Sequence, residues 1–238
     1  MNSSDILQLS LSVVVLGLLI WLSRKSAILK DRLIPQISPN LQTFSLARNQ
    51  MAFWFSIILW SFIHLLIAKH GDLTDIVTSQ ALTLMGISVL TTGGAALVEK
   101  IRDTPEDALN DGLKALGLNS YQDIIALRQS IADLKDKGKA AGLTASKQAT
   151  LNDKILLLQT YTNRITPFIS QGWFKDLVTD IDGAALHRYQ AFLWTVVLGG
   201  IFIYKVCTHP AMPDFDNNLL ALMGISNAGY VGFKANET

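Results

Sequence analysis

The pentapeptide LMGIS stands at residues 84–88 and again at residues 222–226. The likeness continues around it: at a shift of 138 positions, seven of the 13 residues from Leu82 to Gly94 are identical to their counterparts. At a shift of 140, six of the 18 residues from Leu46 to Ile63 are identical as well. The shift changes by two residues between these blocks, in a polar stretch where a loop tolerates a change of length. The sequence therefore predicts an internal repeat of two helices joined by a short outer loop.

Composition places this repeat in a membrane. Of the 238 residues, 50% are hydrophobic and 16% are charged, and the mean hydropathy is +0.32, whereas soluble domains carry about 25% charged residues. Twelve Lys or Arg and twelve Asp or Glu fall between Glu99 and Arg188. We therefore expect a polytopic membrane protein with one polar insert, and not an ordinary soluble enzyme. The net charge of +1 argues against a dedicated nucleic-acid binder.

Five apolar runs are candidate transmembrane helices, because about 20 residues are needed to cross the hydrocarbon core. They cover residues 6–22, 51–68, 81–98, 192–206 and 219–233. The last run is short, so it can span only if protein neighbours cover it or the bilayer adapts. The predicted fold is all-α: a polytopic bundle of five transmembrane helices, with two parallel two-helix repeats and a cytoplasmic helical hairpin.

Charge in the connecting segments predicts the orientation. Five basic residues and one acidic residue lie between Arg24 and Arg48, and cytoplasmic loops are rich in Lys and Arg. The N-terminus is therefore expected outside and the C-terminus inside. The predicted parts are an N-terminal anchor (1–23), a basic cytoplasmic loop (24–50), the first two-helix repeat (51–98), a cytoplasmic helical insert (99–188) and the second two-helix repeat (189–238).

Each repeat opens on the pattern R-x-Q-x-x-x-W, which supplies Arg48 and Trp54 in the first unit and Arg188 and Trp194 in the second. An arginine just before the hydrocarbon can reach phosphates while its stem stays in apolar surroundings. Tryptophan is enriched at the membrane interface. We interpret these four residues as interfacial anchors, with a role in ligand or partner binding as the alternative.

The second helix of each unit combines small and polar side chains, which let helix backbones approach closely. Two interpretations remain open for the polar groups: hydrogen bonds between helices of the bundle, or a hydrated path lined by them. The candidate packing or pore-lining residues are Gly86, Ser88, Thr91, Thr92 and Gly94 in the first unit, and Gly224, Ser226, Asn227 and Gly232 in the second.

Acidic residues precede both of these helices in the predicted outer loops. Asp72 and Asp75 lie in the first loop, and Asp214 and Asp216 lie in the second. One interpretation is local, because Asp216 stands where a helix N-cap is expected. The other is an acidic outer mouth that concentrates cations, which requires a ring of subunits.

The polar insert reads as helical. Pro105 follows a threonine and precedes two acids, which is a typical helix start. Ser120 opens a second helix and Thr144 a third, and both carry apolar residues at three- and four-residue spacing. A charged tip at residues 133–139 separates these two helices, so we expect an antiparallel hairpin. Trp173 and Phe174 predict an amphipathic stretch near the membrane.

The residues that catalysis requires are missing. The single cysteine, Cys207, excludes a disulfide framework and a thiolate zinc cluster, and Thr92-Gly93-Gly94 lacks the lysine of a phosphate loop. The four histidines are scattered, with no pair at metal-ligand spacing: His64, His70, His187 and His209. We expect no catalytic, cofactor-binding or metal site, and no enzymatic activity.

Several blocks of the second half form a longer pattern. They are WFKDL at 173–177, LHRYQ at 186–190, WT at 194–195, AMPDFD at 211–216, LMGIS at 222–226 and GFK at 232–234. This pattern resembles a family of bacterial membrane proteins with no settled activity, and an earlier copy resembles it at Arg48 and residues 50–54. The resemblance covers residues 45–99 and 173–237 and implies a bacterial inner-membrane location. The chain departs from the family at residues 227–229, where the family tends to have a small residue, Gly and Thr.

Two functions follow from these observations as hypotheses. The first is a homo-oligomeric ion channel or pore-like assembly, regulated by the cytoplasmic helical region. The alternative is a non-conducting membrane anchor or scaffold that recruits a cytoplasmic protein partner through residues 99–188. In both, the surroundings are the lipid bilayer, and no nucleic acid is involved.

Overall fold

The computed structural model describes residues 27–31, 33–69, 77–101, 105–180, 183–209 and 211–234. The first predicted span, residues 6–22, lies outside this part of the chain, as do His70, Asp72 and Asp75. Helices account for nearly all regular structure, so the expected all-α class is confirmed. Within the described residues, the exceptions are one two-residue antiparallel strand pair, β1 (Thr179–Asp180) with β2 (Gly183–Ala184), and an isolated bridge between Lys30 and Phe44.

The chain forms two compact units. Of the described residues, unit 1 comprises residues 27–30, 44–69, 77–101, 172–180, 183–209 and 211–234, and unit 2 comprises residues 31, 33–43 and 105–171. Part of the segment expected to be a basic loop therefore packs with the polar insert. The sequence does not predict this packing, because residues 31–43 carry no helical periodicity.

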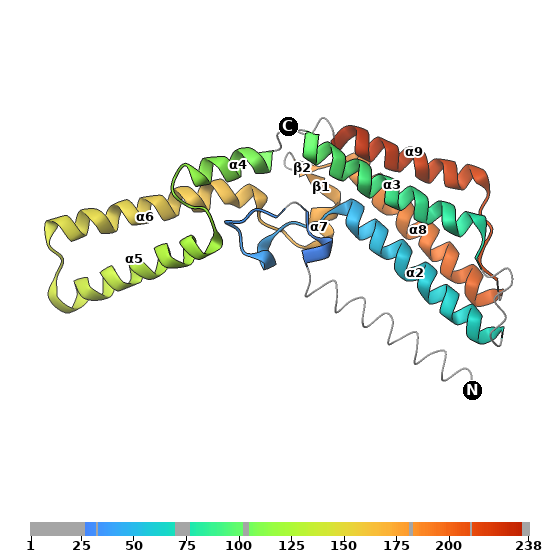
Figure 1. Cartoon of the computed structure of the whole chain (residues 1–238), viewed down its shortest axis with the longest axis horizontal. Coiled ribbons are helices and arrows are strands. Elements are labelled where there is room, and N and C mark those ends of the chain that lie inside the picture. The colour runs from blue at the N-terminus through green and yellow to red at the C-terminus, as the bar shows by residue number, and fades with distance from the viewer. Residues whose placement is uncertain are drawn as a thin grey trace. The chain divides into compact units, whose positions relative to one another are not determined.

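In the part of unit 1 that the structure describes, four long helices form a bundle (Figure 1): α2 (Leu46–Ala68), α3 (Ser79–Ile101), α8 (Leu186–Thr208) and α9 (Asn217–Lys234). α2 packs against α3 and α8, and α9 packs against the same two helices. A core of apolar side chains fills the bundle, including Trp54 and Leu65 of α2, Leu84 of α3 and Phe202 of α8. The two LMGIS helices, α3 and α9, are thus neighbours.

Three of the described helices are long and apolar enough to cross a membrane: α2, residues 79–98 of α3, and α8. α9 is not one of them. Its 18 residues rise about 27 Å at 1.5 Å per residue, and they include two asparagines in the first turn and Asn227 farther along. Neighbouring helices cover its buried side chains, among them Leu220, Met223 and Tyr230.

Unit 1 also holds a short helix, α7 (Trp173–Val178), which packs against α8. Phe44 N–H donates to Asp176 Oδ2 (3.1 Å), and the ring of Phe44 lies 3.4 Å below Lys30 Nζ. Burial lowers the pKa of Lys30, and the nearby Asp176 carboxylate partly opposes that shift. Trp173 Nε1 donates to Asn49 Oδ1 (2.9 Å), which connects α7 to α2.

Unit 2 consists of α4 (Pro105–Lys114) and a hairpin of α5 (Tyr121–Ala141) and α6 (Ala145–Ile165), with its own apolar core. The predicted helix starts are confirmed at Pro105, Ser120 and Thr144. Ser120 forms a capping box with Asp123, because each side chain accepts a hydrogen bond from the other's backbone N–H.

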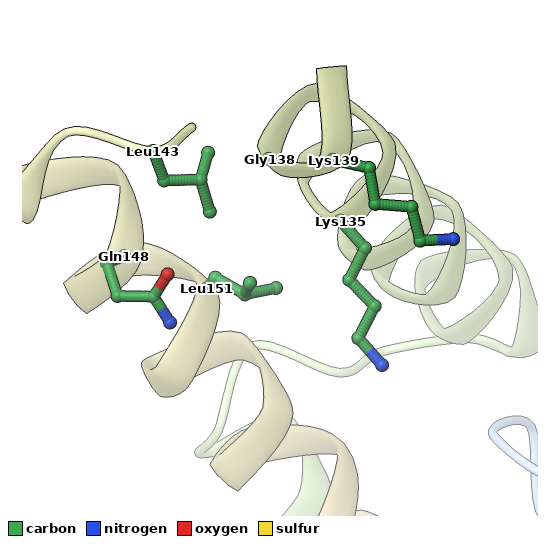
Figure 2. A pocket seen from close by; sticks show the side chains of 6 residues that line it. All are labelled: Lys135, Gly138, Lys139, Leu143, Gln148 and Leu151. Atoms are coloured by element: carbon green, nitrogen blue, oxygen red, sulfur yellow. The ribbon is translucent and has the colours of Figure 1, made fainter. Parts of the chain in front are cut away.

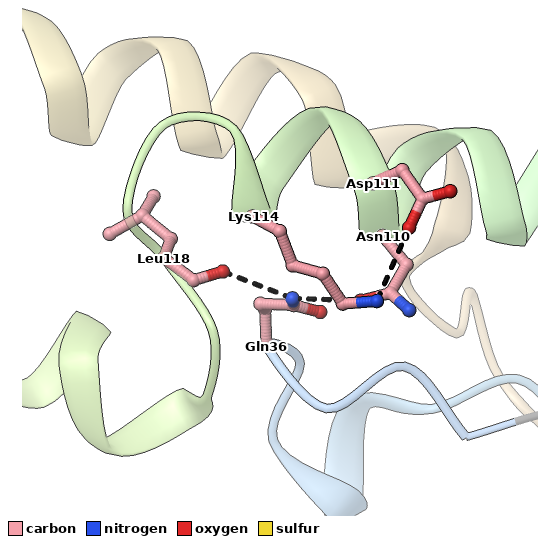
Figure 3. A network of polar contacts seen from close by, with 5 residues as sticks. All are labelled: Gln36, Asn110, Asp111, Lys114 and Leu118. Atoms are coloured by element: carbon pink, nitrogen blue, oxygen red, sulfur yellow. Dashed lines mark hydrogen bonds and ion pairs between the residues drawn. The ribbon is translucent and has the colours of Figure 1, made fainter.

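Buried amides attach residues 31–43 to the helices of unit 2. Gln36 Nε2 donates to Asn110 Oδ1 (2.9 Å) on α4 and to Leu118 O (3.0 Å), and Figure 3 shows these two bonds beside the ion pair of Lys114 with Asp111. Tyr161 of α6 donates its hydroxyl to Gln36 O (2.7 Å). Burial raises the pKa of this tyrosine.

Candidate functional site

A cluster of buried polar side chains joins three helices of unit 1. Gln50, in the second turn of α2, donates with Nε2 to Thr195 Oγ1 (2.7 Å) and Ala191 O (3.1 Å) on α8. The same nitrogen lies 3.3 Å from Asn227 Oδ1 on α9. Gln50 is 3% exposed and Asn227 is 2% exposed. We call these residues, together with Ser226, the amide cluster.

The amide cluster contains more polar groups than it pairs. Gln50 Oε1, Asn227 Nδ2 and Ser226 Oγ are buried and have no hydrogen-bond partner among the described residues. Farther along α2, Trp54 Nε1 and Ser61 Oγ are also buried and unpaired within the described chain. Gln50, Trp54 and Ser61 follow one another at steps of four and seven residues, so their side chains lie on the same, inner face of α2.

The hydroxyl groups of α3 are satisfied mainly by their own helix. Ser88 Oγ donates to Leu84 O (3.0 Å) and Thr91 Oγ1 to Ile87 O (2.7 Å), and both side chains are buried. Thr92 Oγ1 lies within hydrogen-bond distance of Ser88 O (2.9 Å) in its own helix, and of Ala47 O on α2 (3.2 Å). Thr92 therefore provides a contact between two helices, which Ser88 and Thr91 do not.

The predicted packing glycines differ in their surroundings. A Cβ at Gly94 would stand 3.2 Å from Val231 Cγ1 of α9, so this glycine does permit a close approach. At Gly86, Gly224 and Gly232, no heavy atom of the described chain lies within 4 Å of such a Cβ. The closest approach in unit 1 is at Gly199 of α8, where a Cβ would overlap the ring of Phe53.

Gly199 was not among the residues singled out from the sequence. Its counterpart in the repeat alignment is Leu59, and the LMGIS pattern drew attention to α3 and α9 instead. The sequence feature that indicates a close helix approach here is the adjacent glycine pair, Gly199 and Gly200, inside an apolar run.

The two R-x-Q-x-x-x-W patterns have different surroundings. Trp54 is fully buried and lies edge-on to Phe202, with ring centroids 6.2 Å apart, whereas Trp194 is half-buried. Arg188 is buried, with its guanidinium carbon 5.8 Å from the centre of the Tyr230 ring, whereas Arg48 is half-buried. Each motif position is thus buried in one unit and half-buried in the other: the tryptophan is buried in the first unit and the arginine in the second.

Of the acids predicted to lie in the outer loops, the two that the structure describes, Asp214 and Asp216, precede α9. Asp216 caps that helix, because its Oδ1 accepts a hydrogen bond from Asn218 N (3.0 Å) and its carbonyl accepts one from Leu219 N (3.0 Å). Asp214 is exposed, and its carbonyl oxygen accepts a hydrogen bond from Lys205 Nζ (3.2 Å). In the described part of the chain, no three His, Cys, Asp or Glu side chains gather in a way that could hold a metal ion.

Comparisons of the chain with protein-family models, with curated proteins and with solved structures give no match. The site is therefore interpreted from its own contacts.

Proposed function

We propose that the protein is a membrane-anchored scaffold in which unit 1 is the membrane anchor and unit 2 binds a cytoplasmic protein. One observation carries this proposal. The polar residues expected to line a pore, such as Ser88, Thr91 and Asn227, are buried within the bundle of a single chain. Apart from Thr83 and the polar residues at the helix ends, the exposed residues of α3 and α9 are apolar, among them Leu90 and Ile225. Such a surface suits lipid tails or helix packing better than an aqueous pore between subunits.

The organisation of unit 2 supports a recruiting role. It has its own apolar core, which is separate from the two apolar clusters of unit 1. Its hairpin surface is charged, with exposed lysines at the tip such as Lys135, Lys137 and Lys139. A unit that packs independently can present a surface to a partner without disturbing the membrane bundle.

A conducting homo-oligomer is the second candidate, and the unpaired atoms of the amide cluster favour it. A buried polar group without a hydrogen bond costs about 1–3 kcal/mol. Gln50 Oε1, Asn227 Nδ2 and Ser226 Oγ would each find a partner in a hydrated interior. In this alternative the acids before α9 form part of the cation entrance.

The anchor is proposed to have five spans in a bacterial inner membrane, with the N-terminus outside and the C-terminus in the cytoplasm. The repeat and the basic segment between Arg24 and Arg48 support this arrangement. α2 and α8 are both 23 residues long and begin 140 positions apart, at Leu46 and Leu186. Cys207, which is exposed, is expected to react with an impermeant maleimide added from outside, and labelling only after lysis would contradict this topology.

Three measurements on the purified full-length chain separate the two candidates. A scaffold is expected to give no ion flux in proteoliposomes under voltage, calcium or tension, and its detergent complex can be a monomer. Co-purification from cells should recover one partner reproducibly. Flux whose cation preference changes in Asp216→Asn, from a complex with the mass of a ring, would overturn the scaffold in favour of the channel. Gln190→Leu, on an exposed position of α8, is the matched control for the variant proteins.

A further inference from the structure

The core of the α5–α6 hairpin lacks a side chain in the layer nearest its turn. Along α5, the apolar core positions follow at three- and four-residue steps and end at Ile131 and Leu134. The next position in this series is Gly138, which has no side chain to contribute. Leu143, in the loop after α5, lies against that glycine, because a Cβ there would stand 3.1 Å from Leu143 Cγ.

An open depression of about 370 Å³, called the tip cavity below, lies beside this glycine at the end of the hairpin. Figure 2 shows Leu143 and Leu151 pointing into the space, with the stems of Lys135 and Lys139 bordering it along α5 and their ammonium groups directed away. Gly138 and Gln148 complete the lining. The cavity thus has an apolar floor and a cationic rim.

The rim is positively charged and poorly neutralised. No carboxylate of the described chain pairs with Lys135, and the ion pair of Lys139 with Asp136 (3.4 Å) is exposed on both sides. Exposed pairs of this kind contribute little. α6 also begins beside the cavity, and its N-cap residue Thr144 makes no side-chain hydrogen bond to the helix start. The positive end of that helix dipole adds to the potential of the lysines.

We propose that this tip cavity binds one apolar side chain of an acidic peptide segment, with the flanking carboxylates held by Lys135 and Lys139. The inference rests on the scaffold function proposed above and names the kind of partner that unit 2 recruits. The apolar floor consists of two leucines, Leu143 and Leu151, which offer contact to one apolar side chain. The charge of the rim requires an acidic partner.

The binding test uses the full-length protein in detergent micelles and a fluorescein-labelled peptide in which one leucine lies between two pairs of glutamates. We expect saturable binding by fluorescence anisotropy. Replacing the leucine by alanine should weaken binding by about tenfold, because most of an apolar side chain is then lost from the cavity. Equal binding of the two peptides, or no saturable binding up to about 1 mM, would overturn the proposal.

Two double variants separate the cavity from general electrostatics. Lys135→Glu with Lys139→Glu should weaken binding by at least about tenfold. Lys137→Glu with Lys147→Glu makes the same change in net charge at the same tip but does not alter the cavity lining, and it should have less than about a threefold effect. Equal losses in the two doubles would contradict a specific site. Tighter binding of phosphatidylglycerol vesicles than of the peptide, lost in the first double, would assign the cavity to lipid instead.

Co-purification from cells distinguishes failure of this inference from failure of the scaffold function. If the wild type recovers a partner and the Lys135/Lys139 double variant recovers it equally well, the tip cavity is not the docking site, and the scaffold function stands. If the wild type recovers no partner, the scaffold function is wrong. In that case the peptide titration still tests, independently of any cellular partner, whether the tip cavity binds an acidic peptide.

Discussion

Replacing Gln50 by leucine tests whether the amide cluster holds the bundle together. The substitution removes the two N–H donors of Nε2, which three acceptors share: Thr195 Oγ1 (2.7 Å) and Ala191 O (3.1 Å) are near, and Asn227 Oδ1 (3.3 Å) is farther away. Hydrogen bonds between membrane helices contribute about 0.6 kcal/mol on average, with a maximum near 1.7 kcal/mol.

The three acceptors of Gln50 are affected unequally by the substitution, and the removal of an unpaired oxygen offsets part of the cost. Ala191 O keeps the hydrogen bond from Thr195 Oγ1 (2.8 Å), so it is not left unpaired. Asn227 Oδ1 loses the bond to Gln50 inside the bundle, at a cost of about 1–3 kcal/mol. Leucine also removes the unpaired Gln50 Oε1, which recovers part of that cost. We expect Gln50→Leu to lower the free energy of unfolding by about 1–2 kcal/mol.

A double-mutant cycle identifies the partner. Asn227→Leu alone removes one weak bond together with the unpaired Nδ2, so its effect should be within about 0.5 kcal/mol. In that background Gln50→Leu should cost about 0.5–1 kcal/mol less than in the wild type, which is the coupling between the two amides. Reversible unfolding in mixed micelles measures these differences. The control is Gln190→Leu at the equivalent, exposed position of the repeat, and equal effects of Gln50→Leu and Gln190→Leu would refute the reasoning.

Three further predictions test other parts of the structure. Gly199→Ala should destabilise unit 1 by about 1–3 kcal/mol, because its Cβ overlaps Phe53, whereas Gly86→Ala, with open space around it, should be neutral or stabilising in the same unfolding assay. Asp123 accepts backbone hydrogen bonds at the start of α5 that hold its pKa below 3.8, so its stabilising effect is present above that pH and is lost as the pH falls through the lowered pKa; the protection factors of the amides at the start of α5, which correct for the intrinsic slowing of exchange in acid, should then fall on acidification, and less so in Asp123→Asn. Burial raises the pKa of Tyr161 above 10.0, so the free energy of unfolding should fall as the pH rises past 10.0, where the tyrosine of the unfolded chain ionises first. Tyr161→Phe should remove this pH dependence. At neutral pH the same variant should cost about 1–2 kcal/mol, because it loses the 2.7 Å hydrogen bond to Gln36 O.

Helix starts and apolar spans were predictable because each depends on nearby residues. Pro105, Ser120 and Thr144 mark helix starts in the structure as they do in the sequence. The span expected at residues 192–206 lies within α8, but that helix begins six residues earlier, at Leu186. Hydropathy indicates only the apolar part of a helix. Arg188 and Gln190 belong to α8, but their polar side chains place them outside the apolar run, so the helix start was predicted too late.

Long-range contacts were not predictable from a single sequence. The bond from Phe44 N to Asp176 Oδ2 joins residues 132 positions apart, and neither residue belongs to a periodic pattern that would indicate the other. The packing of residues 31–43 with unit 2 has the same character, because it depends on the buried side chain of Gln36 reaching α4. Amphipathic periodicity identifies a buried face but not the element that covers it.

The repeat alignment does not predict the contact between Gln50 and Asn227. In the alignment, Gln50 corresponds to Gln190 and Asn227 corresponds to Val89. Gln50 and Asn227 are buried and bonded to each other, whereas Gln190 and Val89 are both exposed. A bundle whose two halves were equivalent would bury both pairs or neither. A buried glutamine lowers the stability of the bundle unless its amide is hydrogen-bonded. The repeat unit that buries its glutamine therefore requires a polar residue on the helix that packs against it. Asn227 of α9 meets that requirement.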